Sequence, residues 1–160
     1  MHLSARSIIG CMGKSVWSAN GKSIFRDTCG GAVREIIEQA FWEQGAEAGE
    51  TAKQQGKCDL STAPGIYEAL NDYYLNGMPC DQADMVVRAE ADRVVWESGA
   101  WLQEQNWKRV GADAKMMAAF YRKWLAGFVS GANGKYNFRQ INDRLIGDTV
   151  NRYEICQGRV

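Results

Sequence analysis

The chain has 160 residues, a size that fits one domain, because a single hydrophobic core usually stops growing only near about 250 to 300 residues. Lys and Arg together number 19, as do Asp and Glu, so no net charge draws the chain to nucleic acid or to an anionic membrane. Hydrophobic residues make up 46% and charged residues 24%, which is the composition of a folded globular protein. No stretch approaches the roughly 18 uninterrupted apolar residues that a membrane-spanning helix needs.

The first 27 residues differ in composition from the rest of the chain. They are rich in Ser, Gly and Lys, and Asn20-Gly21 stands between two apolar pairs, which is typical of a tight hairpin turn. We therefore predict a short N-terminal β-hairpin or irregular segment over residues 1–27. From residue 28, apolar residues recur with helical spacing to about Gln55, and Gly56 supplies a stop. This pattern predicts an amphipathic helix.

Four further helices are predicted downstream. One begins near Ser61 or Thr62 and ends before Gly77, and the next runs from Asp81 to about Lys108. Asp113 is expected to cap a helix with a broad aromatic face, and the last helix covers about Asn137 to Cys156. The predicted fold is all-α, a compact bundle of about five helices over 28–160 within a single domain of 1–160.

A short internal repeat links two of these helices. The pattern WxxGxxxG occurs at Trp42, Gly45 and Gly49 and again at Trp124, Gly127 and Gly131. Glycines four residues apart make a helix groove without side chains, in which a second helix could approach closely or a ligand could lie beside the tryptophan. Because each glycine weakens a helix by about 1 kcal/mol, we expect these glycines to contact another helix.

Histidine chemistry is nearly excluded, because the only histidine is His2, beside the amino terminus. A nucleophile activated by histidine would lack its general base, and a zinc site built from several histidines would lack its ligands. The sequence contains no phosphate-binding glycine loop. No cofactor and no metal are predicted. An enzyme built on paired carboxylates stays an alternative, and its candidate acids are the helical Glu35, Glu38, Glu43, Asp92 and Glu97.

Five cysteines are more than a cytosolic chain of this length usually carries, and none forms a CxxC motif. The interpretations left open are at least one disulfide among Cys29, Cys58, Cys80 and Cys156, reduced structural thiols, or a metal-binding or reactive thiol. The amino terminus lacks the apolar run of a secretory signal. The chain is expected to be cytoplasmic if it is complete, and periplasmic or secreted if a signal peptide has been removed.

Two stretches resemble known families. Trp124-Leu-Ala-Gly-Phe-Val-Ser-Gly-Ala-Asn133, with Tyr153-Glu-Ile-Cys156 downstream, resembles small exported bacterial helical proteins that are loosely related in pattern to periplasmic acid-stress chaperones. The segment from Phe41 to Cys80 is similar to type VI secretion immunity proteins built from helices and paired cysteines. Together the two stretches cover about half of the chain. The resemblance implies an exported binding protein without catalytic residues, and it implies no particular partner.

The predicted function is a non-catalytic protein-binding module of the immunity, chaperone or phage- or plasmid-encoded inhibitor type. Trp and Tyr supply much of the energy at hot spots of protein interfaces, and basic residues could rim such a patch. The candidate contact residues are Trp101, Trp107, Tyr73, Tyr74, Arg88, Arg93, Lys108 and Arg109. The protein target is unidentified, and homodimer formation stays open.

Two other functions are weighed against this one. A small-molecule binder would use the glycine groove beside Trp42 or Trp124. A single-stranded nucleic-acid surface would need Trp107-Lys108-Arg109 to converge with Tyr121-Arg122-Lys123, and the zero net charge disfavours it.

Overall fold

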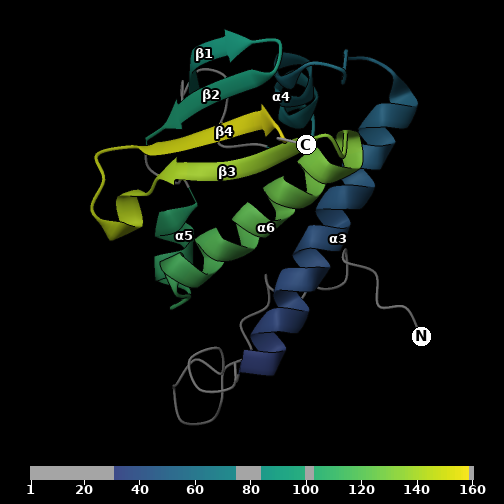
Figure 1. Ribbon diagram of the computed structural model, residues 1–160. Coiled ribbons are helices and arrows are strands. Elements are labelled where there is room, and N and C mark those ends of the chain that lie inside the picture. The colour runs from purple at the N-terminus through teal and green to yellow at the C-terminus, as the bar shows by residue number, and fades with distance from the viewer. Residues whose placement is uncertain (1–30, 75–83, 100–102, 159–160) are drawn as a thin grey trace, which may run out of the picture.

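The computed structural model describes residues 31–74, 84–99 and 103–158, and the predicted N-terminal hairpin lies outside these ranges. Within them the chain is a mixed α/β protein, with α-helices packed on a four-stranded antiparallel sheet (Figure 1). The elements are α3 (Gly31–Gln55), α4 (Ala63–Asn71), β1 (Asp84–Glu90), β2 (Arg93–Ser98), α5 (Glu104–Arg109), α6 (Ala114–Ala132), β3 (Tyr136–Asn142), the 3-10 turn η2 (Arg144–Ile146) and β4 (Asn151–Gln157). The prediction of an all-α bundle is therefore wrong. In the described part of the chain, no helix is both long and apolar enough to cross a membrane.

Three helices form where the sequence predicted them, because their signals are local. Helix α3 ends at Gln55, and Gly56 follows with φ +61°, a left-handed conformation that glycine adopts without strain. The Thr62 side chain caps α4 by accepting a hydrogen bond of 3.2 Å from the Gly65 N–H. The carboxylate of Asp113 caps α6 by accepting one of 2.8 Å from the Lys115 N–H.

The predicted helix from Asp81 to Lys108 is wrong, because most of its described residues form the hairpin β1–β2, followed by the short α5. The apolar spacing matched a helix, but the adjacent pairs Val86-Val87 and Val94-Val95 are β-branched and favour strands. The hairpin turn lies at residues 91–92, between β1 and β2. Pairing with neighbouring strands decided the outcome.

The predicted last helix from Asn137 to Cys156 is also wrong, because this segment forms β3, η2 and β4. Apolar side chains recur at every second residue of these strands, a period that fits a strand rather than a helix. Tyr136 and Phe138 lie on one face of β3, and Tyr153 and Ile155 lie on the same face of the sheet in β4. Gly147, with φ +116°, ends η2 and lets the chain turn back.

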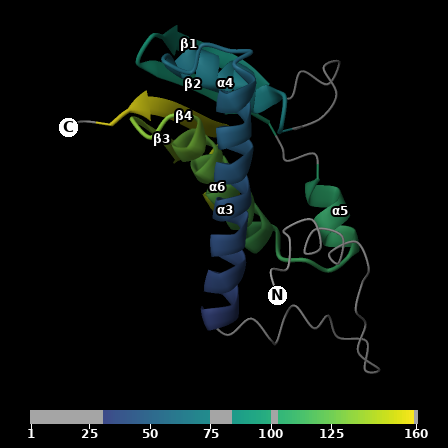
Figure 2. The ribbon, with the colours of Figure 1, turned by 90° about the vertical axis from the view of Figure 1, so that its right-hand side faces the viewer.

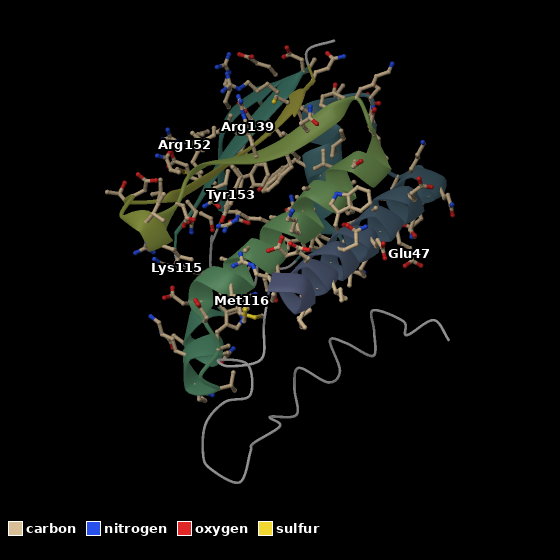
Figure 3. The ribbon with its side chains drawn as sticks, turned by 60° about the horizontal axis from the view of Figure 1, so that its bottom comes forward. Glu47, Lys115, Met116, Arg139, Arg152 and Tyr153 are labelled. Atoms are coloured by element: carbon tan, nitrogen blue, oxygen red, sulfur yellow. The ribbon has the colours of Figure 1, made fainter. Side chains whose placement is uncertain are left out.

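The sheet has the strand order β1-β2-β4-β3, so β1 and β3 are its edges. Helices α4 and α6 pack against its inner face, and α3 lies alongside α6 (Figures 1 and 2). Figure 3 shows Tyr153 on the side of the sheet that faces α6, whereas Arg139 and Arg152 lie on the opposite, outer face.

Ion pairs cover the outer face of the sheet. Glu154 is fully buried there and pairs with Arg93 from β2 and Arg139 from β3. Burial alone would raise the pKa of Glu154, but the hydrogen bond and charge of Arg139, together with the charge of Arg93, outweigh burial and lower it. The ionised carboxylate therefore joins three neighbouring strands. A second pair joins Glu97 of β2 to Arg152 of β4, with 2.9 Å between Oε1 and Nε.

Helices α3 and α6 run parallel and meet at their glycines. A Cβ atom on Gly45 would lie far closer than 3.0 Å to the Trp124 carbonyl oxygen, and one on Gly127 would be as close to the Trp42 carbonyl oxygen. Gly49 and Gly131 meet the neighbouring backbone in the same way, at Phe128 and Ala46. The main chain of the opposite helix therefore occupies the groove at all four glycines, and no room for a ligand is left there.

Candidate functional site

Aromatic side chains line the inner face of the sheet. Trp96 of β2 is paired with Tyr153 of β4, and their ring centroids are 5.4 Å apart. Phe138 of β3 lies 5.9 Å from Tyr153 and 6.1 Å from Trp96. Residues opposite each other in an antiparallel pair point to the same face, so three strands present one continuous aromatic layer toward the helices.

The helices add further rings to this layer. Tyr67 of α4 lies 4.8 Å from Trp96, and Tyr74, just after α4, lies 6.2 Å from Trp124 and 6.4 Å from Tyr121 of α6. We call the whole set the aromatic cluster. It comprises Phe41, Tyr67, Tyr73, Tyr74, Trp96, Trp107, Phe120, Tyr121, Trp124, Phe128, Phe138 and Tyr153.

Within the cluster, burial raises the pKa values of several tyrosines, and one carboxylate, that of Asp84, raises three of them further. Burial raises the pKa of Tyr74 well above its usual value, and the neighbouring Tyr153, Asp84, Tyr121 and Tyr67 raise it further. Burial and then Asp84 raise the pKa of Tyr67 to about 12, and the same two causes raise that of Tyr153. We call Tyr67, Tyr74, Tyr121 and Tyr153, together with Asp84, the tyrosine group.

The register of the sheet explains why Asp84 belongs to this group. Asp84 is the first residue of β1 and lies opposite Ser98, and Val86 lies opposite Trp96. Asp84 therefore projects from the inner face of the sheet, two residues along β1 from Val86, the residue that lies opposite Trp96. Tyrosine hydroxyls are protonated at neutral pH, because their ordinary pKa is about 10, so they can both donate and accept hydrogen bonds. The group combines aromatic faces with directional polar contacts.

The hydroxyl group of Tyr73 lies next to this region. The Tyr73 ring is 5.5 Å from that of the fully buried Phe128, and its Oη atom is itself buried. Among the residues that the structure describes, this oxygen has no hydrogen-bond partner. A buried hydroxyl without a partner costs about 1 to 3 kcal/mol, so its presence requires an explanation.

A polar network closes one end of the aromatic layer. Arg122 of α6 donates to Gln140 Oε1 at 2.9 Å and forms an ion pair of 3.0 Å with Asp143. Asn151 of β4 is 1% exposed; its amide nitrogen donates to the Gly99 carbonyl at 3.0 Å, and its Oδ1 accepts from the Arg144 N–H at 3.0 Å. The Arg122 guanidinium group is therefore paired with Gln140 and Asp143 within the protein.

The predicted partner-binding residues do not form one surface. Trp107 is 7% exposed and, with Tyr73 and Tyr74, belongs to the aromatic cluster inside the protein. The four basic residues separate, because Arg88 and Arg93 lie on β1 and β2 whereas Lys108 and Arg109 lie on α5. Trp101 lies outside the described residues.

The candidate acids do not assemble into a catalytic pair. Glu38 forms ion pairs with Arg34 and Lys123, and the hydrogen bond from Arg34 is the largest cause of its lowered pKa. A carboxylic acid that donates a proton to a glycosidic oxygen needs the opposite shift. Glu97 is paired with Arg152. The side chains of the other three acids, Glu35, Glu43 and Asp92, are exposed.

The nucleic-acid alternative brings together two aromatic residues, but not at the surface. The rings of Trp107 and Tyr121 are 5.5 Å apart within the aromatic cluster. Arg122 is held by Gln140 and Asp143, and Lys123 pairs with Glu38. Neither ring is exposed, so a nucleobase could not stack on Trp107 or Tyr121.

A disulfide was one of the interpretations left open by the sequence, and the two cysteines in the described part of the chain do not form one. Cys58, in the loop between α3 and α4, and Cys156, on β4, are both free thiols, and burial is the first cause that raises the pKa of each. Cys29 and Cys80 lie outside the described residues. In the part of the chain that the structure covers, no three His, Cys, Asp or Glu side chains gather in a way that could hold a metal ion.

Sequence reasoning missed the positions of Asp84 and Trp96 on strands of the sheet. Both lie within the helix that the sequence predicted from Asp81 to Lys108, and none of Tyr67, Tyr121 and Tyr153 was assigned to the small-molecule site, which was placed beside Trp42 or Trp124. The available signal was the two-residue alternation around Trp96 and Tyr153, which places each ring on the same face as its strand's other inner residues.

Comparison with known proteins gives structural likeness only. No protein family and no curated protein matches the chain. One similar solved structure is a trafficking protein particle complex subunit 3 from Naegleria fowleri covalently bound to palmitic acid, with a TM-score of 0.50, 10% identity, and coverage of 97% of this chain and 91% of that one. Another is the phenol-responsive sensory domain of the transcription activator PoxR with phenol, with a TM-score of 0.50, 13% identity, and coverage of 98% and 75%. These identities support a shared α/β fold and nothing finer.

Proposed function

We propose that this chain is a small-molecule-binding domain whose ligand is held against the aromatic cluster and oriented by the tyrosine group. The observation that carries the proposal is the gathering of aromatic rings on the inner side of the sheet, where the ring centroids of Tyr67 and Tyr153 lie 4.8 and 5.4 Å from that of Trp96. Ligand sites are mostly apolar and aromatic, with a few placed polar groups that fix orientation. The tyrosine group has this composition.

The energetic argument concerns the choice of tyrosine over phenylalanine. Phenylalanine would fill a core equally well, whereas each buried hydroxyl adds a cost unless it finds a hydrogen-bond partner. The tyrosine group places several hydroxyls in one apolar region, and the neighbouring Tyr73 Oη has no partner among the described residues. A ligand that donates a hydrogen bond to the Tyr73 hydroxyl, or accepts one from it, would account for this one group.

The two similar structures support the same proposal. Each has a similar α/β fold, and the first is covalently bound to palmitic acid whereas the second holds phenol. The ligand position proposed for this chain differs from the one predicted from the sequence, because the glycine groove between α3 and α6 is closed by backbone.

Titration of the full-length protein with phenol, followed by tryptophan fluorescence, tests the proposal. Trp96 and Trp124 lie in the aromatic cluster, so saturable quenching and a raised melting temperature are expected. Tyr67→Phe and Tyr153→Phe should weaken binding. Tyr136→Phe is the matched control, because the Tyr136 hydroxyl donates to the Ser61 carbonyl at 2.8 Å outside the tyrosine group. Equal loss in all three variants, or no binding of phenol or larger phenols by the wild type, would count against the site.

A second candidate function is the protein-binding module predicted from the sequence, and β1 is the feature that favours it. This strand is at an edge of the sheet and is exposed along most of its length, with Met85, Val86 and Val87 between 45% and 60% exposed. An exposed apolar edge strand offers main-chain groups to another strand. If a second copy pairs there, sedimentation should show concentration-dependent dimers that Val87→Lys removes and Lys115→Glu, on α6, leaves unchanged.

A further inference from the structure

The outer face of the sheet presents one arginine from each strand, and the central carboxylate lies beneath them. We call these residues the arginine face: Arg88 of β1, Arg93 of β2, Arg152 of β4 and Arg139 of β3. The side chains of Arg139 and Arg93 are 62% and 34% exposed, whereas Glu154, which they share, is 0% exposed. In the described part of the chain, neither guanidinium group pairs with another acid. Two cations on one buried anion leave a positive surplus and free N–H donors at the surface.

The exposed side of α3 carries the opposite charge. Glu43, Glu47 and Glu50 follow the spacing i, i+4, i+7, so they lie on one side of the helix, roughly opposite the glycines that contact α6. All three side chains are exposed, and none forms an ion pair with a Lys or Arg that the structure describes. We call these three residues the acidic stripe.

The arginine face and the acidic stripe lie on different sides of the molecule. In Figure 3, Glu47 lies on α3 and Arg139 and Arg152 lie beyond the sheet, with α6 between them. One copy of the chain therefore cannot join its own two surfaces.

The two surfaces have similar dimensions. Glu43 and Glu50 are about 10 Å apart along the helix axis. Arg88 and Arg139 stand at the two ends of one row across the sheet, three strand spacings or about 14 Å apart. Long arginine side chains can bridge the remaining difference, so one helix side fits across the four strands.

We propose that copies of this chain associate head to tail, with the acidic stripe of one copy docked on the arginine face of the next. Charge complementarity selects a second copy as the occupant, because each chain carries both surfaces while its net charge is zero. Glu90 and Glu97 stand among the arginines as partners of Arg88 and Arg152, and they would repel a uniformly anionic surface such as nucleic acid.

This contact joins two different surfaces, so it is heterologous and continues to a third copy unless a ring closes. It differs in this respect from pairing of two β1 strands, which would stop at a dimer. The inference is independent of the proposed small-molecule site, because that site lies on the inner face of the sheet.

Sedimentation velocity of the full-length protein at low and high salt tests the inference. At an ionic strength of about 10 mM the average sedimentation coefficient should rise with protein concentration beyond that of a dimer. At about 1 M it should return to the monomer value, because the Debye length falls from about 30 Å to about 3 Å. A protein that stays monomeric at low salt, or a dimer that persists at high salt, would overturn the inference.

Two double variants each remove one of the surfaces. Glu43→Lys with Glu47→Lys reverses the acidic stripe, and Arg88→Gln with Arg139→Gln weakens the arginine face. Each variant alone should associate about tenfold more weakly than the wild type. Mixed in equal amounts, they should form one-to-one dimers and nothing larger, because each keeps the surface that the other has lost. A mixture that associates no better than its components would contradict a head-to-tail contact.

The matched control is Glu68→Lys with Asp72→Lys, which makes the same change of net charge at exposed positions in and just after α4. This control should associate like the wild type, and an equal loss would mean that net charge alone governs association. Melting curves show whether each variant is folded. The acidic-stripe variant changes only exposed helical side chains, so its comparison with the control decides even if the arginine variant does not fold.

Discussion

Gly45 and Gly127 occupy equivalent positions in two copies of one motif, and each faces the carbonyl of the tryptophan that lies three residues before the other. Gly49 and Gly131 repeat this reciprocal relationship one helical turn further on. The two helices therefore meet with local two-fold symmetry although they belong to one chain. Close backbone approach replaces side-chain interdigitation along this contact.

Gly45→Ala should destabilise the protein by about 2 to 3 kcal/mol, because the added methyl group meets backbone that cannot move aside. The higher helix propensity of alanine offsets only about 1 kcal/mol of the strain. Urea unfolding measures the loss. Gly134→Ala is the control, since its new Cβ would have only an ordinary contact of 3.8 Å with the Ser130 carbonyl oxygen. Similar stability of both variants would contradict the backbone contact.

Glu154→Gln should cost about 3 kcal/mol, because it leaves the guanidinium groups of Arg93 and Arg139 without their shared carboxylate. Glu90→Gln removes a pair with Arg88 in which both side chains are about half exposed, and should cost under about 0.5 kcal/mol.

The Glu154 carboxylate also makes the free energy of unfolding depend on pH. Its pKa is lower in the folded protein, so its stabilisation is present above about pH 4.5 and is lost as the pH falls through the folded value. Acid unfolding of Glu154→Gln should therefore begin from lower stability and depend less steeply on pH. An acid limb identical to that of the wild type would contradict this assignment.

Alkaline pH should destabilise the protein through its buried tyrosines. In the folded state the pKa of Tyr67 is about 12, and those of Tyr74, Tyr121 and Tyr153 are also raised, chiefly by burial. The unfolded chain loses these protons near pH 10. Stability should therefore be level below pH 10 and then fall, by about 1.4 kcal/mol per pH unit for each tyrosine. The fall should be less steep for Tyr67→Phe between pH 10 and 12. A tyrosinate absorbance titration in which Tyr67 ionises near pH 10 would argue against its burial.

Tyr73→Phe should leave the stability unchanged or raise it by up to about 1 kcal/mol, because the hydroxyl that it removes has no partner among the described residues. Tyr136→Phe, in contrast, loses the bond to the Ser61 carbonyl and should cost about 1 kcal/mol. Thermal unfolding compares the two variants. A loss of stability at position 73 as large as that at 136 would mean that the Tyr73 hydroxyl binds a water molecule or a ligand in the free protein.

Only the residue types of the candidate site, and not their arrangement, were predictable from the sequence. The tyrosines and tryptophans were recognised as apolar stripes or interface anchors, but the sequence pattern gave no reason to place Tyr67, Trp96 and Tyr153 against one another. Asp84 gave no signal by itself. Its position depends on the register of β1 with β2, which sequence spacing does not specify.

By itself, the sequence determined the features that depend on near neighbours along the chain. The caps at Thr62 and Asp113, the stop at Gly56 and the helical spacing of α3 and α6 act within about one helical turn. Tertiary structure decided between helix and strand for the segments now in β1 to β4. Their valines and aromatic residues fit both periods over a short window, and only hydrogen bonds to strands distant in sequence, such as Trp96 with Tyr153, made the extended form the more stable one.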